Sequence, residues 1–172
     1  MQNLILDSQQ RSATHLYFAN AFRYPTEAQS DEQQQLDYVA GFDCSVYKSA
    51  CSLHEAAYTT EGQEVLYEEL TRFYEFFGLG REHSAELPDH LSVELEFMHF
   101  LSFLEAQDST DEAARASLLT AQRDFFSRHL AQLTTDVADN FSHDSAHYRE
   151  LLEDLQVFMD SEKNHFGLAP GR

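Results

Sequence analysis

The stretch ELPDHLSVELEFMHFL, residues 86–101, decides the fold of this chain. From Leu91 onward its apolar residues, placed at 100° per residue, cover well over half the circumference of a helix. A helix that apolar is usually central to its domain. Pro88 suits the first turn of this helix, where a missing backbone N–H costs little. We therefore predict a central, buried helix that begins at Pro88.

The composition extends this prediction to the whole chain. Leucine (21) and alanine (18) far outnumber valine (6) and isoleucine (1), and Leu, Ala, Glu and Gln are strong helix formers. Six glycines and three prolines leave few places to break long elements. The 172 residues suggest one domain with a real hydrophobic core. We predict an all-α, single-domain helical bundle over residues 1–166, followed by a disordered tail at 167–172.

Start and stop signals place the other helices. Thr60 with Gln63 and Ser109 with Glu112 resemble capping boxes, and Gly78 follows one helix as a C-terminal stop. The predicted elements, in chain order, are helices at 8–23, 26–42, 45–58, 60–77 and 109–133, a short element at 136–141, and a last helix within 143–166.

The charge is strongly acidic, with 30 Asp plus Glu against 11 Lys plus Arg and a formal net charge of -19. Such a surface repels nucleic acids and anionic membranes, and it attracts basic partners. A merely solvated acidic surface explains the same numbers. The start of the chain has no basic segment typical of a signal peptide, and the densest apolar run, 97–104, is too short to span a membrane. We expect a cytoplasmic protein.

The two cysteines, Cys44 and Cys51, are seven residues apart, and we expect them on a similar face of one helix. They form no Cys-x-x-Cys pair and no evident zinc set, so we expect reduced, partly buried thiols.

Three ionisable residues accompany the start of the central helix. Glu94 projects into the apolar sector, and His90 stands one turn before it, so the two can meet at i and i+4. Asp89 adds a second carboxylate at the positive end of the helix. A carboxylate in an apolar sector must be paired or protonated. Either His90 and Glu94 pair with each other in a purely structural role, or all three residues form the wall of a binding pocket.

Other chemistry finds little support in the sequence. We find no nucleophile elbow, no glycine-rich phosphate loop and no cysteine with a motif-placed histidine, and we expect no enzyme. Glu96 with His99 and Glu162 with His165 have the Glu-x-x-His spacing of di-iron helical bundles. A metal-binding bundle is therefore one alternative, and a general helical adaptor is another. A second possible metal pair, His143 and His147, is better explained as an exposed capping stretch.

The stretch at 86–101 also resembles the signature of the TorD/DmsD/NarJ-type redox-enzyme maturation chaperones. In that family a Glu-x-Pro-Asp-His-like run opens a helix that continues as Leu-x-x-Glu-Leu-x-Phe-Met. Two further stretches are similar to other helices of the family: RSATHLYFANAFRYPT at 11–26, and RDFFSRHLAQL at 123–133 followed by YRELLEDLQVFM at 148–159.

This resemblance implies an all-helical chaperone dedicated to one molybdenum-cofactor oxidoreductase. It would bind the basic N-terminal segment of that enzyme, often a twin-arginine signal peptide, and would hold the apo enzyme until its cofactor is inserted. No cofactor of its own is expected, and the chaperone would be a monomer or a domain-swapped dimer.

The resemblance also names candidate peptide-binding residues. Asp89 and His90 match the signature, and Glu86, Pro88 and Glu94 support them. Our hypothesis is that Asp89 pairs with an arginine of the client while His90 and Glu94 shape the pocket floor. Aromatic residues just before the loop at 78–86 would offer apolar surface; they are Tyr74, Phe76 and Phe77.

Overall fold

The computed structural model describes residues 5–26, 31–80, 86–107 and 111–168, and this part of the chain is helical as predicted. Its α-helices are α1 (Ser8–Ala21), α2 (Glu32–Phe42), α3 (Gln63–Phe76), α4 (Leu91–Ala106), α5 (Glu112–Phe125), α6 (Ala131–Asn140) and α7 (Ala146–His165). Two short elements complete them: a 3-10 turn η1 (Glu55–Ala57) and a π-helical turn η2 (Phe126–Leu130). No strand occurs in the described residues, whose one β-type pairing is an isolated bridge between His54 and His90.

Helix α4 is central, as its apolar sequence predicts. It packs most extensively against α1 and also contacts α5 and η2. Leu91, Leu95, Met98 and Leu101 are fully buried in the core. Its first residue is Leu91 and its N-cap is His90, so Pro88 lies before the helix and not in its first turn.

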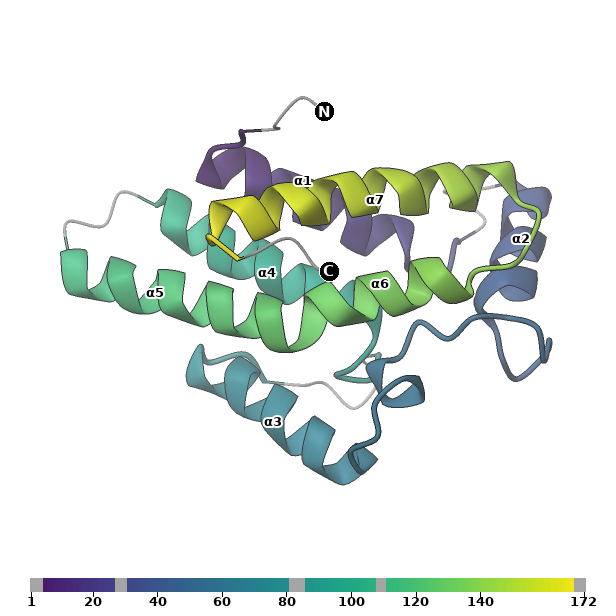
Figure 1. Ribbon diagram of the computed structural model, residues 1–172, viewed down its shortest axis with the longest axis horizontal. Coiled ribbons are helices and arrows are strands. Elements are labelled where there is room, and N and C mark those ends of the chain that lie inside the picture. Colours follow the sequence, from purple (N-terminus) through teal and green to yellow (C-terminus); the bar gives the residue numbers. More distant parts are fainter. Residues whose placement is uncertain (1–4, 27–30, 81–85, 108–110, 169–172) are drawn as a thin grey trace.

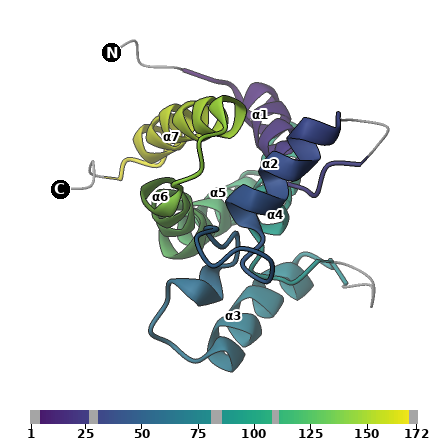
Figure 2. The same ribbon diagram turned by 90° about the vertical axis from the view of Figure 1, so that its right-hand side faces the viewer.

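In both views the helices lie at three levels. Helices α1 and α7 lie at the top, α4, α5 and α6 lie in the middle, and α3 lies below them, set apart from the rest (Figures 1 and 2). Leu66 and Leu70 are the buried anchors of α3, while much of its surface is exposed. This arrangement leaves surface of α3 free on both sides of its contact with the bundle.

The region between α2 and α3 contradicts the prediction of a helix at 45–58. It consists of turns and extended segments with only η1 in helical form. Asp43 explains the start of this loop, because its carboxylate accepts hydrogen bonds from the backbone and hydroxyl of Ser45 at 2.9 and 2.5 Å. Cys44 and Cys51 are therefore not on one helix; both thiols are free, the first exposed and the second buried.

The predicted helix boundaries are right in some places and wrong in others. Gly78 has φ +73° just after α3 and ends that helix as predicted. The Thr60–Gln63 capping box does not form, because the N-cap of α3 is Gly62. Helix α5 is capped by Asp111, whose carboxylate accepts from the amides of Ala113 and Ala114. The predicted cap Ser109 lies outside the described residues.

The break expected near Leu133 is absent. Helices α5 and α6 continue into each other through η2, so residues 112–140 form one long helical rod with a π turn in its middle. At the end of α7, Gly167 has φ +64° and the Leu168 amide donates to the Lys163 carbonyl at 2.9 Å. These two residues cap the helix, and residues 169–172 of the predicted tail lie outside the described part. In that part, none of the helices has the length and hydrophobicity needed to cross a bilayer.

Candidate functional site

Asp89 is fixed in a buried polar network at the start of α4. The chain around it pairs with the loop before η1: the Leu91 amide donates to the Leu53 carbonyl at 2.8 Å, and the Glu55 amide donates to the Asp89 carbonyl at 2.9 Å. The carboxylate of Asp89 is 3.0 Å from His54 Nδ1 and accepts a hydrogen bond from the Ala56 amide at 3.0 Å. Its side chain is fully buried.

These partners determine the ionisation of Asp89. Burial alone would raise its pKa, but the hydrogen bonds from His54 and from the Ala56 amide outweigh burial and lower the pKa. The carboxylate is thus charged and already engaged by the fold, with no surface toward solvent. An arginine from outside the protein could reach it only if this network opened.

His90 is the N-cap of α4 and does not pair with Glu94, so that structural expectation was wrong. Its Nδ1 accepts a hydrogen bond from the Ser92 amide at 3.2 Å and lies 2.8 Å from the Ser92 hydroxyl. Burial, followed by the proximity of His54, lowers the pKa of His90 to about 4. The imidazole is therefore neutral near pH 7, and it acts as a hydrogen-bond acceptor that caps the helix.

Glu94 is the least satisfied group of the region. It is completely buried, and neither carboxyl oxygen makes a hydrogen bond of normal geometry. Burial raises its pKa well above the usual range, and the nearby carboxylate of Glu55 adds to the shift. Its protonated form is thus favoured, and the side chain lies entirely inside the protein.

The same network contains residues that the sequence did not single out. His129, in the π turn η2, lies between two carboxylates: its Nδ1 is 3.1 Å from Glu55 Oε2 and its Nε2 is 3.2 Å from Glu69 Oε1. Arg128 also forms an ion pair with Glu69. His129 belongs to the stretch 123–133 that resembles the family, which was a usable signal. Nothing in the local sequence marks Glu55, because its role depends on a loop between helices.

A groove lies on the outer side of this network. Its volume is about 820 Å³, and the end of α1, the second half of α3, the outer face of α4 and the segment before α4 enclose it. The apolar part of its lining is made of Tyr24, Tyr74, Leu79, Pro88, Val93, Phe97 and Phe100. The hydroxyl of Tyr74 donates to the Pro88 carbonyl at 2.7 Å, which fixes α3 to the segment that leads into α4.

Three exposed carboxylates, those of Glu75, Glu86 and Glu96, also line the groove. Arg23 is the one arginine or lysine among the described residues of the lining, and its Nη2 donates to Glu96 Oε2 at 2.7 Å. An acidic rim over an aromatic lining can accept an extended segment that carries both cations and apolar side chains.

The structure separates the candidate residues into three groups. Tyr74, Pro88 and Glu86 line the groove. Asp89, His90 and Glu94 lie in the buried network that supports its wall.

Phe76 and Phe77 form the third group, on another side of α3. They line two neighbouring clefts of about 680 and 530 Å³ toward α5 and the end of α4, and Phe76 is 79% exposed. These two phenylalanines are not part of the groove.

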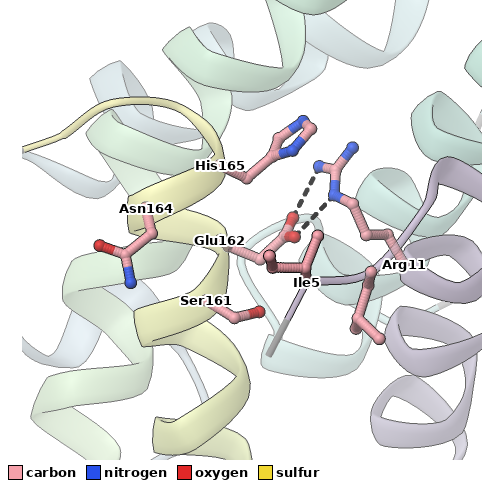
Figure 3. Close-up of a pocket in the computed structure, with 7 residues that line it drawn as sticks. Ile5, Arg11, Ser161, Glu162, Asn164 and His165 are labelled. Atoms are coloured by element: carbon pink, nitrogen blue, oxygen red, sulfur yellow. Dashed lines mark hydrogen bonds and ion pairs between the residues drawn. The ribbon is translucent and has the colours of Figure 1, made fainter. Parts of the chain in front are cut away.

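The residues considered for a di-iron site do not converge. Glu96 pairs with Arg23 at the surface, and His99 Nδ1 is 3.0 Å from the Ser12 carbonyl. Glu162 instead receives two hydrogen bonds from Arg11, at 2.6 and 2.7 Å, as the dashed lines of Figure 3 show. Among the described residues, no group of three His, Cys, Asp or Glu side chains has the geometry of a metal site.

The chain is similar to known assembly chaperones. It matches the family model "Nitrate reductase delta subunit" over residues 9–139. It is 34% identical over 146 residues to the selenate reductase assembly chaperone protein of Thauera selenatis, covering 75% of this chain and 76% of that protein. It is 28% identical over 186 residues to the chlorate reductase assembly chaperone protein of Ideonella dechloratans, covering 99% and 96%. It is 35% identical over 95 residues to the perchlorate reductase assembly chaperone protein of Dechloromonas aromatica (strain RCB), covering 54% and 42%.

Proposed function

Because this chain belongs to the nitrate reductase delta subunit family, as its resemblance to redox-enzyme maturation chaperones implied, we propose that it is a dedicated assembly chaperone for one molybdenum-containing oxidoreductase. It binds the apo enzyme in the cytoplasm and holds it until the molybdenum cofactor is inserted. It acts by binding and not by catalysis.

The contact at the centre of this proposal is between the groove and the basic N-terminal segment of the client, of the twin-arginine type. The observation that carries it is that Glu75, Glu86 and Glu96 line the same groove as several aromatic residues. Arginine guanidinium groups form forked, charge-assisted hydrogen bonds with carboxylates, and they also stack on aromatic rings. The apolar residues that accompany the arginines would lie against Phe97 and Phe100.

The proposal modifies our hypothesis for the site. Glu86, Pro88 and Tyr74 contact the peptide, whereas Asp89 and His90 hold the segment that carries Glu86 and Pro88 in place. The engaged carboxylate of Asp89 supports this division, because a peptide arginine would have to compete with the hydrogen bonds from His54 and Ala56.

Calorimetry with twin-arginine peptides from molybdoenzymes tests the proposal. We expect micromolar, salt-sensitive binding that falls about tenfold, or 1.4 kcal/mol, when both arginines become lysines. Glu86→Gln and Glu75→Gln should each weaken binding. Glu153→Gln is the matched control, because Glu153 is an exposed carboxylate on α7 and does not line the groove. Absence of binding by every peptide, or equal effects of Glu86→Gln and Glu153→Gln, would reject the groove as the site.

A further inference from the structure

Two arginines of α1 and its C-terminal end form ion pairs of opposite character. Arg11 is 1% exposed, and its guanidinium donates to Glu162, Glu105 and Gln122. Arg23 is 47% exposed and pairs with Glu96, which is 48% exposed. Its other hydrogen bond goes to Asn20 Oδ1 at a longer distance of 3.2 Å. The first pair is built into the core, whereas the second lies in solvent at the edge of the groove.

The ion pair between Arg23 and Glu96 lies in the groove itself, because both residues belong to its lining. Among the described residues, Glu75 and Glu86 have no ion pair, so Glu96 is the one groove carboxylate already bound to a guanidinium. A client arginine that approached Glu96 would find the same chemical group in place.

We propose that Arg23 competes with an arginine of the client for the carboxylate of Glu96, and that the client's arginine displaces Arg23 when the peptide binds. This inference rests on the proposed function of the groove. An exposed pair contributes little net stability because water screens it and its side chains lose conformational freedom, so the exchange is inexpensive. Arg23 thereby raises the affinity that a segment must have before it occupies the groove, and it discriminates against weakly basic segments.

The competition predicts tighter binding when Arg23 is removed. Arg23→Gln should lower the Kd for a twin-arginine peptide by roughly two- to fivefold, since the freed carboxylate no longer has to exchange its partner. Arg149→Gln is the control for the general effect of losing one positive charge. Arg149 is 53% exposed, pairs with Asp144 at 3.2 Å, and does not line the groove.

A double variant separates the competition from long-range electrostatics. In a Glu96→Gln background, Arg23→Gln should no longer tighten binding, because the contested carboxylate is gone. Calorimetry on the full chain measures all variants with the same peptide, and far-UV circular dichroism checks that each is folded.

The outcomes distinguish this inference from the function on which it rests. If the wild-type protein binds no peptide, the proposed function fails and the inference fails with it. If the wild type binds but Arg23→Gln behaves as Arg149→Gln, or tightens binding equally in the Glu96→Gln background, the competitor role is overturned while the function stands.

Discussion

Asp89 stands at the boundary between the groove and the buried network, and its carboxylate faces the network. Its neighbours Glu86 and Pro88 line the groove, whereas Asp89 holds His54 and the Ala56 amide. Under the proposed function, one short segment therefore contains residues of two kinds, those that contact the peptide and those that hold the segment in shape. The two kinds should respond differently to substitution.

We expect Asp89→Asn to destabilise the protein by about 1–3 kcal/mol, because a buried charged acceptor loses part of its hydrogen bonding. Urea denaturation measures this. Peptide affinity of the folded variant should stay within about twofold of wild type, which corresponds to well under 1 kcal/mol. Glu86→Gln should show the reverse, with unchanged stability and weaker binding. A stable Asp89→Asn variant with greatly reduced affinity would instead favour direct pairing of Asp89 with the client arginine.

Glu94 gives a prediction with a pH dependence. Its pKa is raised in the folded state, so between its unfolded pKa, about 4.5, and its folded pKa the native protein holds a proton that the unfolded chain does not. Stability is lost as the pH rises through this window. Glu94→Gln mimics the protonated form. The free energy of unfolding of the variant should therefore rise relative to that of wild type as the pH rises, by at most about 1.4 kcal/mol per pH unit.

Urea denaturation at pH 5, 6, 7 and 8 checks this result for Glu94→Gln. Glu96→Gln, on the exposed side of the same helix, is the control and should run parallel to wild type. A difference between Glu94→Gln and wild type that does not change with pH would mean that Glu94 is ionised in the folded protein.

Single residues also show how far sequence reasoning reaches. The period of the helix identified Glu94 as a buried carboxylate, because that depends only on local geometry. It could not identify the neighbouring carboxylate of Glu55, which comes from a loop about forty residues earlier in the chain. Arg23 and Val93 were missed as groove residues for the same reason: neither has a local motif, and only the packing of α1, α3 and α4 brings them together.

At the scale of elements, helices with strong apolar periodicity were predicted well. Helices α1, α4 and α7 lie within a few residues of their predicted positions. The helix expected at 45–58 was wrong because backbone and side-chain hydrogen bonds of Asp43, Ser45 and Asp89 favour turns there. The continuous rod formed by α5, η2 and α6 was missed because a π turn shifts the helical period without a glycine or proline to mark it.

At the scale of elements, a buried ion pair joins α1 to α7. Arg11 and Glu162 are each 1% exposed and form a forked ion pair, with His15 Nε2 3.0 Å from the same carboxylate. Burial alone would raise the pKa of Glu162, but the hydrogen bonds from Arg11 and His15 lower it to about 2. Arg11 and Glu162 line a cavity of about 150 Å³. Ile5 and His165 line it too (Figure 3).

Arg11→Met should destabilise the protein by about 3–5 kcal/mol, because it leaves a buried carboxylate unpaired. The double variant Arg11→Met/Glu162→Met should recover much of this loss. Since the pKa of Glu162 is depressed, wild type should lose about 3 kcal/mol as the pH falls from about 4.5 toward 2, and this part of the acid sensitivity should be absent in Glu162→Gln. Urea denaturation between pH 2 and 7 measures both effects. Equal destabilisation by the single and double variants would show that packing, not charge, dominates.

At the scale of the whole molecule, the acidic surface and the groove act together. In the proposed function, the net charge of -19 accelerates the approach of the client's basic segment from a distance, and the aromatic lining with its carboxylates holds that segment at close range. The fold class and family were predictable from composition and one long signature. The groove was not, because it lies between α1, α3 and α4, and its shape depends on how α3 is set against the bundle.

Site-specific photocrosslinking tests the central claim most directly. A photoreactive amino acid replaces Val93 in the groove, Phe76 in the clefts toward α5, or Val157, which is 61% exposed on α7. Each variant is irradiated with the same twin-arginine peptide, and mass spectrometry identifies the products. We expect efficient crosslinking from position 93, with the crosslinks on the peptide close to its two arginines, and only background crosslinking from positions 76 and 157. Stronger crosslinking from 76 than from 93 would place the client on the other side of α3 and contradict the groove as its binding site.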